Sequence, residues 1–145
     1  MPSTRPVTMR VSADLIWECL KDSSSFIRKS RNAPVMTAEP SNLCGLNSFK
    51  FSGLACQKPI DVSIQTTGKK QTIMLMKKPK SRKVLRRPKM FVGTGIKNET
   101  KKGIEAITKE IDGAFYRKDL KDMIVQKYLK IKQSFRKNKK IPVLR

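Results

Sequence analysis

The sequence contains no histidine, and its three cysteines (Cys19, Cys44 and Cys56) are not spaced as a zinc site requires. Without an imidazole there is no histidine general base, no Ser–His or Cys–His pair and no histidine metal ligand. Asp119 and Asp122 could face one metal ion, but two acids at this spacing also suit the first turn of a helix. We therefore expect no cofactor, no bound metal and no enzymatic activity.

Long apolar runs are also absent. The longest run, Ile73–Met76, is far shorter than the roughly 18 residues that cross a bilayer. The N-terminus has no apolar segment of the kind found in signal peptides. An odd number of cysteines without close pairs is typical of a reduced, intracellular protein. We therefore expect a protein that is neither secreted nor bound to a membrane.

Acidic residues are scarce: 11 Asp and Glu stand against 33 Lys and Arg, which gives a net charge of +22. The excess is concentrated in two stretches. Residues 62–98 contain eleven basic residues and no acid, and residues 123–145 contain eight basic residues and no acid. Clustered cations of this kind favour binding to a polyanion, and they are the electrostatic pattern of a nucleic-acid binder.

The densest basic segment is MKKPKSRKVLRRPK, residues 76–89, with eight Lys and Arg and two prolines. These charges repel one another, so gathering them in one segment does not stabilise a fold. Binding to an external anion therefore explains the segment better than a solvated loop does. Pro79 and Pro88 favour an extended backbone, which can enter RNA clefts that are too narrow for a helix. We predict a basic extended arm over residues 79–97.

The remaining pattern predicts an α+β fold. Residues 1–10 are expected to be a flexible extension, and residues 11–78 a helix followed by a small antiparallel sheet of about four strands. Ser12 is the expected N-cap of a helix over residues 13–21. Strands are expected within 25–29, 47–54, 59–66 and 71–78. Gly68 is suited to the turn of a hairpin between the last two.

After the arm, apolar residues recur at helical spacing, so residues 98–145 are expected to form two helices that pack on the sheet and end in a basic tail. The first has Asn98 as its expected N-cap and Gly113 near its end. Its predicted apolar face is Ile104, Ile107, Ile111 and Phe115. The second begins near Lys118, and its predicted apolar face is Leu120, Met123, Ile124, Tyr128, Ile131 and Phe135.

Three segments carry a resemblance to a known family: LIWECLKDSSSFIRK, EPSNLCGLNSFKFSGL and YRKDLKDMIVQKYLKIKQSFRK. In this order they resemble the ribosomal protein 28e family of the eukaryotic large ribosomal subunit, from about Ser12 to Lys139. The resemblance implies a structural constituent of the cytosolic 60S subunit that is assembled in the nucleolus and located in cytoplasmic ribosomes. Its implied partners are large-subunit rRNA and neighbouring ribosomal proteins, with no small-molecule substrate and no homo-oligomer.

The mechanism expected from the charges is neutralisation of rRNA phosphates by basic side chains. The residues predicted to bind rRNA are Arg28, Lys29, Arg31, Lys77, Lys78, Lys80, Arg82, Lys83, Arg86, Arg87, Lys89, Arg117, Lys132, Arg136, Lys137, Lys139 and Lys140. Phe49 and Phe51 alternate with polar residues, so we predict that they pack in the core and do not stack on bases. For Phe91 the two interpretations stay open.

Three other functions fit parts of the sequence. A related domain begins the Mak16 family of nucleolar pre-rRNA assembly factors, which share the early tryptophan and a loop like NLCGL. An enzyme acting on RNA would need converging carboxylates, and six of the 11 acids lie in residues 99–122. A basic amphipathic helix over residues 120–140 could bind membranes or calmodulin. The last alternative leaves the cations of residues 62–98 unexplained.

Overall fold

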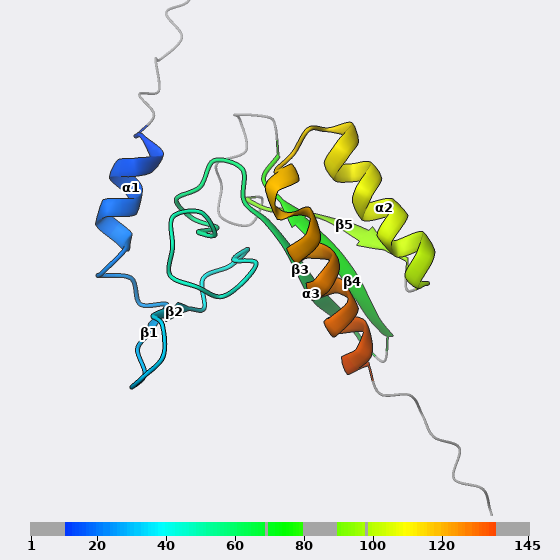
Figure 1. Ribbon diagram of the computed structural model, residues 1–145, viewed down its shortest axis with the longest axis horizontal. Helices are drawn as coiled ribbons and strands as arrows, with labels where there is room; N and C mark the ends of the chain where they lie inside the picture. The colour runs from blue at the N-terminus through cyan, green and yellow to red at the C-terminus, as the bar shows by residue number, and fades with distance from the viewer. Residues whose placement is uncertain (1–10, 69, 80–89, 98, 136–145) are drawn as a thin grey trace, which may run out of the picture. The chain divides into compact units, whose positions relative to one another are not determined.

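A computed structural model describes residues 11–68, 70–79, 90–97 and 99–135 (Figure 1). The chain divides into two compact units, residues 1–59 and residues 60–145. Each unit holds helix and antiparallel strand, so the predicted α+β class is confirmed, including its two C-terminal helices. No helix in the described part of the chain is long and apolar enough to cross a membrane.

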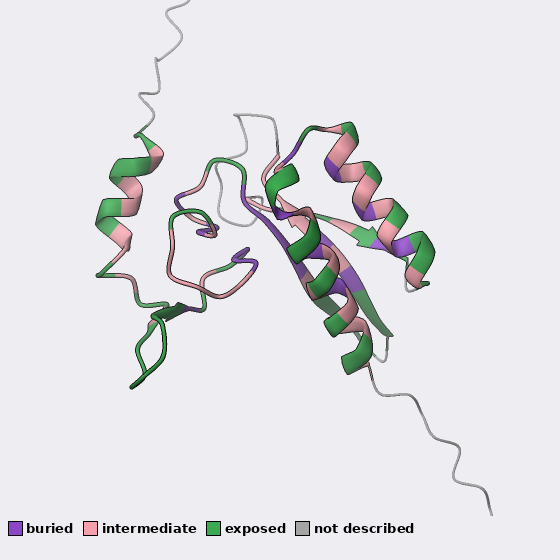
Figure 2. Ribbon diagram, in the orientation of Figure 1, coloured by how far each residue is buried: buried purple, intermediate pink, exposed green. Residues whose placement is uncertain are grey.

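The first unit begins with helix α1, Ala13–Leu20, which confirms the prediction for residues 13–21. Ser12 is its N-cap, and the Ser12 hydroxyl accepts a hydrogen bond of 3.2 Å from the Leu15 N–H. Asp14 lies in the first turn, where a carboxylate interacts favourably with the helix dipole. Figure 2 shows that α1 has exposed and half-buried residues only.

Two short strands follow, β1 (Ile27–Arg28) and β2 (Met36–Thr37), and they pair antiparallel. On its other side β2 meets a third segment, because Met36 forms a bridge to Leu46. The backbone N–H of Asn47 donates to the Val35 carbonyl at 3.0 Å. The sequence predicted the first of these strands, but it did not predict β2 or the contact of β2 with residues 45–47.

The predicted strand over residues 47–54 is wrong, because these residues form consecutive turns. Ser52 N–H donates to the Ser48 carbonyl at 3.0 Å, which is a helical spacing and not a strand ladder. Phe49 is 37 % exposed, and its ring lies 6.0 Å from the Trp17 ring of α1. The alternation of phenylalanine with serine and lysine therefore reflects a turn with Phe49 on its outer side, and Phe49 is not a core residue.

The second unit is built on a three-stranded antiparallel sheet in the order β3–β4–β5. Strands β3 (Ile60–Thr67) and β4 (Lys70–Lys77) form the predicted hairpin, and Gly68 turns it with φ of 59°. Such a positive φ is readily adopted by glycine. Strand β5 (Val92–Ile96) pairs with the free side of β4.

Strand β5 corrects the predicted arm over residues 79–97, because residues 92–96 pair with β4 as part of the sheet. The strand was not predicted because its sequence VGTGI contains two glycines, which have low strand propensity. The structure gives these glycines a packing role. A Cβ atom on Gly93 would lie 3.0 Å from both Met74 Cε and Met76 Sδ of β4. The absence of side chains at Gly93 and Gly95 therefore leaves room for the two methionines on the same face of the sheet.

Helices α2 (Thr100–Gly113) and α3 (Lys121–Ser134) contact each other, α3 packs on β3, and α2 packs on β5 (Figure 1). A single 3-10 turn, η2 (Lys118–Leu120), precedes α3. The core of this unit comes from apolar residues of the strands and of both helices. Its buried members are Ile60, Val62, Ile73, Leu75, Ile96, Ile107, Ile111, Tyr116, Leu120, Ile124 and Tyr128.

The predicted apolar faces of the two helices need two corrections. Phe115 is 75 % exposed, because α2 ends at Gly113 and Phe115 has a φ of 47°, which turns the chain away from the helical path. Met123 is 41 % exposed on α3. The predicted N-cap Asn98 lies outside the described residues, and the structure assigns the N-cap of α2 to Glu99.

Candidate nucleic-acid interface

Three of the predicted RNA-binding cations lie at the turn between β1 and β2, which we call the hairpin tip (residues 28–32). Arg28, Lys29 and Arg31 are all exposed, and no acid lies among residues 28–32. Asn32 has a φ of 56° in the left-handed region, which turns the chain sharply at this point. The hairpin tip therefore presents three cations to solvent, two of them guanidinium groups that can hold a phosphate with two hydrogen bonds.

Two other predicted cations lie at the end of β4. Lys77 forms an ion pair with Glu110 of α2, and both side chains are partly exposed. This pair joins the sheet to the helix that covers it, so Lys77 has a structural partner. Lys78 Nζ lies 6.0 Å from the centre of the Phe91 ring, within the range of a cation–π contact. Phe91 thus packs against a cation of its own unit.

Arg117 and Lys132 also have partners inside the second unit. Arg117 has a φ of 51°, only 15 % of its side chain is exposed, and its Nε and Nη2 donate to the two Asp119 carboxylate oxygens at 3.0 and 3.1 Å. Lys132 Nζ donates to the Thr100 hydroxyl. Lys132 therefore joins α3 to the first residue of α2, whereas the pair of Arg117 with Asp119 is local to the turn before α3.

The other predicted RNA-binding residues lie outside the described part of the chain. They are Lys80, Arg82, Lys83, Arg86, Arg87, Lys89, Arg136, Lys137, Lys139 and Lys140. Within the described residues, no three His, Cys, Asp or Glu side chains gather in a way that could hold a metal ion. The pair with Arg117 also accounts for Asp119 without a metal.

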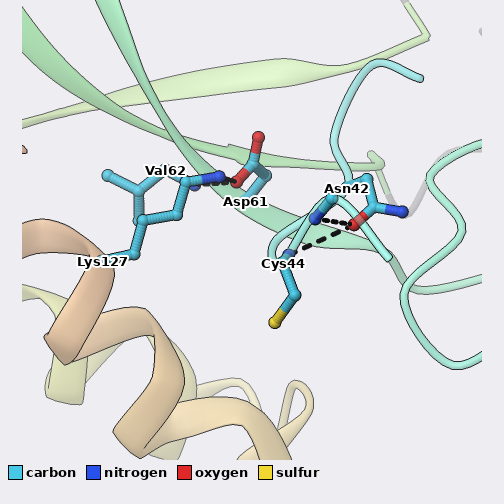
Figure 3. Close-up of polar contacts among 6 residues, drawn as sticks. Asn42, Cys44, Asp61, Val62 and Lys127 are labelled. Atoms are coloured by element: carbon cyan, nitrogen blue, oxygen red, sulfur yellow. Dashed lines mark hydrogen bonds and ion pairs between the residues drawn. The ribbon is translucent and has the colours of Figure 1, made fainter. Parts of the chain in front are cut away.

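The second unit contains a buried carboxylate that the sequence did not single out. Asp61 of β3 forms an ion pair with Lys127 of α3, and its Oδ1 accepts a 2.7 Å hydrogen bond from the Val62 N–H (Figure 3). Burial raises the pKa of Asp61, although Lys127 and the Val62 N–H both act to lower it. Asp61 is the one charged residue of β3, and the sequence could have drawn attention to it for that reason. Its partner Lys127 is visible only in the fold.

Comparison with known proteins identifies the family. The Ribosomal L28e protein family matches residues 15–134, which is most of the chain. The chain belongs to this family. Large ribosomal subunit protein eL28 of Schizosaccharomyces pombe is 29 % identical over 136 residues, which cover 92 % of this chain and 99 % of that protein.

Two further relatives with the same name match over shorter segments. The protein of Dictyostelium discoideum is 43 % identical over 53 residues, which cover 37 % of this chain and 39 % of that protein. The protein of Caenorhabditis elegans is 37 % identical over 59 residues, which cover 40 % of this chain and 47 % of that protein. In both alignments the chain spans less than half of the relative's length.

In this L28e chain, the segment EPSNLCGLNSFKFSGL is organised around Asn42. The Asn42 Oδ1 accepts a hydrogen bond from the backbone N–H of Cys44 at 3.2 Å (Figure 3). The same oxygen accepts from the Gly45 N–H at 2.7 Å, and the Asn42 Nδ2 donates to the Leu46 carbonyl at 2.9 Å. Gly45 has a φ of 71°, which favours glycine. One amide side chain thus holds the turn that brings Leu46 to β2.

Glu39 holds the second half of the same loop. Its carboxylate accepts hydrogen bonds from the Gly53 N–H at 2.9 Å, from the Ser52 hydroxyl at 3.2 Å and from Asn42 Nδ2 at 3.3 Å. Gly53 passes so close to Pro40 that a Cβ atom there would lie 1.9 Å from the Pro40 carbonyl oxygen. Glu39 is therefore a structural residue, and the sequence did not predict this role because its partners follow up to 14 residues later.

Proposed function

We propose that this L28e protein is a structural constituent of the large subunit of cytosolic ribosomes, that it binds rRNA, and that it has no catalytic role. The family match and the names of three relatives support membership of the large subunit. Assembly of the particle would take place in the nucleolus. The observation that carries the rRNA part is the distribution of charge, with eleven cations in residues 62–98, eight in residues 123–145 and no acid in either stretch.

The predicted RNA-binding cations that the structure describes have two kinds of surroundings. Lys77, Lys78, Arg117 and Lys132 have partners within the second unit, and their contact with rRNA stays a prediction. The exposed cations of the hairpin tip are proposed to bind rRNA phosphates. The cations of the basic arm (residues 80–89) and of the C-terminal tail (residues 136–145), which lie outside the described residues, are proposed to do the same. Each such contact releases condensed counterions, which gives strong binding without reading of base sequence.

The proposed membership is tested by sedimenting a cell extract at physiological and at high salt. A stoichiometric, salt-resistant presence in mature large subunits and polysomes is expected for a ribosomal protein. Presence only in nuclear precursor particles would replace the proposal with an assembly factor of the Mak16 type. Absence from all particles would refute both functions.

The contribution of the hairpin tip is tested by replacing Arg28, Lys29 and Arg31 with glutamine. The matched control replaces Lys101, Lys109 and Lys118, three exposed lysines of a stretch whose charges balance. Both triple variants lose the same charge, but only the hairpin-tip variant is expected to dissociate from large subunits at a lower salt concentration. Equal salt resistance of the two variants would show that the hairpin tip does not bind rRNA.

A further inference from the structure

The outer side of α1 has a composition that is unusual for this chain. At 100° per residue, Leu15 and Cys19 form one row along the helix, and Asp14, Glu18 and Asp22 form the adjacent row. All five residues are exposed. Leu15 is 56 % exposed and Val11, which precedes the helix, is 59 % exposed. We call the five residues and Val11 the α1 outer face.

The fold of the first unit uses the opposite side of the helix. Trp17 lies 6.0 Å from the Phe49 ring at an interplanar angle of 53°, and the Lys21 carbonyl accepts a 2.8 Å hydrogen bond from Asn47 Nδ2. These contacts fix α1 without help from the α1 outer face. Leu15 is therefore an exposed apolar side chain that the described part of the unit does not require.

Local helix chemistry accounts for part of the acidic row only. Asp14 in the first turn interacts favourably with the helix dipole, and Glu18 forms an ion pair of 2.6 Å with Lys21. Neither effect explains why an exposed apolar row lies beside the acids. Exposed apolar side chains that adjoin one another next to charged residues mark sites of interaction with other proteins.

The α1 outer face is negatively charged, and this charge is unfavourable for RNA, which is the partner that the rest of the chain favours. Three of the chain's 11 acids lie within residues 14–22, and Lys21 is the only cation there. Carboxylates repel RNA phosphates, so this face is unfavourable for rRNA. Complementarity instead requires a partner that presents cations beside an apolar side chain.

We propose that the α1 outer face binds a basic segment of a neighbouring protein in the assembled large subunit. In this contact Leu15 and Val11 pack against an apolar side chain of the partner, while Asp14, Glu18 and Asp22 pair with its Lys or Arg residues. The contact rests on the proposed membership of the large subunit. It is distinct from rRNA binding, which uses the cations of the hairpin tip, arm and tail.

Photo-cross-linking within purified large subunits tests this contact. One full-length variant carries p-benzoylphenylalanine in place of Leu15, and a second carries it in place of Arg28 of the hairpin tip. After irradiation, the Leu15 probe is expected to cross-link to a protein peptide rich in Lys and Arg, and the Arg28 probe to rRNA. The cross-linked peptide is identified by mass spectrometry.

Charge reversal shows whether the acids matter. Glu18→Lys with Asp22→Lys places cations near the C-terminal end of α1, where the helix dipole tolerates them, so the helix is retained. This change is expected to lower the yield of the Leu15 cross-link at least about threefold. The matched control, Glu105→Lys with Asp112→Lys, reverses two acids of α2 in the other unit and is expected to leave the yield unchanged. Asp112 lies in the last turn of α2 and pairs with Lys121, so the control also removes one lysine pair.

The outcomes separate this inference from the proposed function. An Arg28 cross-link to rRNA together with a Leu15 cross-link to rRNA, to a second copy of this chain, to an acidic peptide or to nothing would overturn the inference alone. An unchanged Leu15 yield after charge reversal would also overturn it. Absence of both probe variants and of the unmodified chain from large subunits would overturn both proposals.

Discussion

Gly103 of α2 and Tyr128 of α3 occupy one narrow space in the second unit. The hydroxyl of the fully buried Tyr128 donates its one proton to the Lys97 carbonyl (2.9 Å) and shares it with the Glu99 carbonyl (3.3 Å), just before α2 begins. Burial raises the pKa of this phenol. A Cβ atom on Gly103 would lie 2.1 Å from the Tyr128 oxygen. A glycine inside a helix, usually unfavourable, here makes room for the residue that joins α3 to the start of α2.

Gly103→Ala is therefore expected to destabilise the protein, because Tyr128 must move or lose its hydrogen bonds. We expect a loss of about 1–3 kcal/mol in the free energy of unfolding, measured by urea denaturation. Gly113→Ala is the control, since nothing lies within 4 Å of a Cβ atom at Gly113. The control should be neutral or slightly stabilising; equal effects of the two changes would contradict the steric explanation.

The raised pKa of Asp61 predicts that its contribution to folding stability decreases as the pH rises. Burial raises its pKa in the folded protein, so the folded state binds a proton more tightly than the unfolded state does. The resulting contribution to stability is complete below the unfolded pKa of the carboxyl, and it is lost as the pH rises through the raised folded pKa. Asp61→Asn keeps the shape of the side chain and removes this titration.

Urea unfolding of both proteins from about pH 3.5 to about pH 7 measures this effect. The stability of the original protein relative to Asp61→Asn should fall as the pH rises across this range. A relative stability that increases with pH would mean that the pair with Lys127 outweighs burial and lowers the pKa. A constant difference would mean that the folded and unfolded pKa values of Asp61 are equal.

At the scale of elements, α1 is held by few tertiary contacts among the described residues. The helix has eight residues and no buried one, and an isolated helix of this length is marginal in water. Its tertiary anchor is the contact between Trp17 and Phe49, in addition to the hydrogen bond from Asn47 to the Lys21 carbonyl. Elements with few buried contacts open at low free energy.

Trp17→Ala is expected to expose the amides of residues 13–20 to hydrogen exchange, while residues 60–67 and 121–134 keep their protection. The reason is that Trp17 and its partner Phe49 both belong to the first unit. Leu15→Ala serves as the control, because Leu15 is exposed and its replacement should leave exchange unchanged. Faster exchange throughout the chain after Trp17→Ala would show that α1 is part of one cooperative unit with the sheet.

For the whole molecule, charge is distributed unevenly between the two units. Residues 1–59 contain eight basic and four acidic residues, a net charge of +4, and residues 60–145 contain 25 basic and seven acidic residues, a net charge of +18. Some of the second unit's cations are paired within the fold, as with Lys77, Lys121 and Lys127. Eleven of the second unit's cations lie in residues 80–89 and 136–145.

Replacing Arg82, Lys83, Arg86 and Arg87 with glutamine is expected to weaken binding of the full chain to purified large-subunit rRNA. In a plot of the logarithm of the binding constant against the logarithm of the salt concentration, the negative slope should become less steep. The expected change is about 0.7–0.9 for each phosphate that the variant no longer neutralises. The urea midpoint should not change. The control replaces Lys101, Lys102, Lys109 and Lys118, and an equal decrease in the control would show that binding follows total charge and not the arm.

The sequence by itself determined the features that depend on neighbouring residues and on total composition. These are the capped helix α1, the hairpin of β3 and β4, the two C-terminal helices, the concentrated positive charge and the resemblance to L28e proteins. Apolar spacing, N-caps and turn glycines act over a few residues, so they are readable without a fold. The hairpin-tip cations Arg28, Lys29 and Arg31 were also named from sequence, and the structure places all three in solvent.

Only the tertiary structure decided which side chains meet across long separations. Lys77 meets Glu110 33 residues later, and Asp61 meets Lys127 66 residues later. Strand β5 exists because β4 offers a free edge and methionines that its glycines accommodate. Residues 47–54 form turns because local hydrogen bonds and close backbone packing compete with a strand. Such outcomes depend on the packing of a whole unit, which no local pattern encodes.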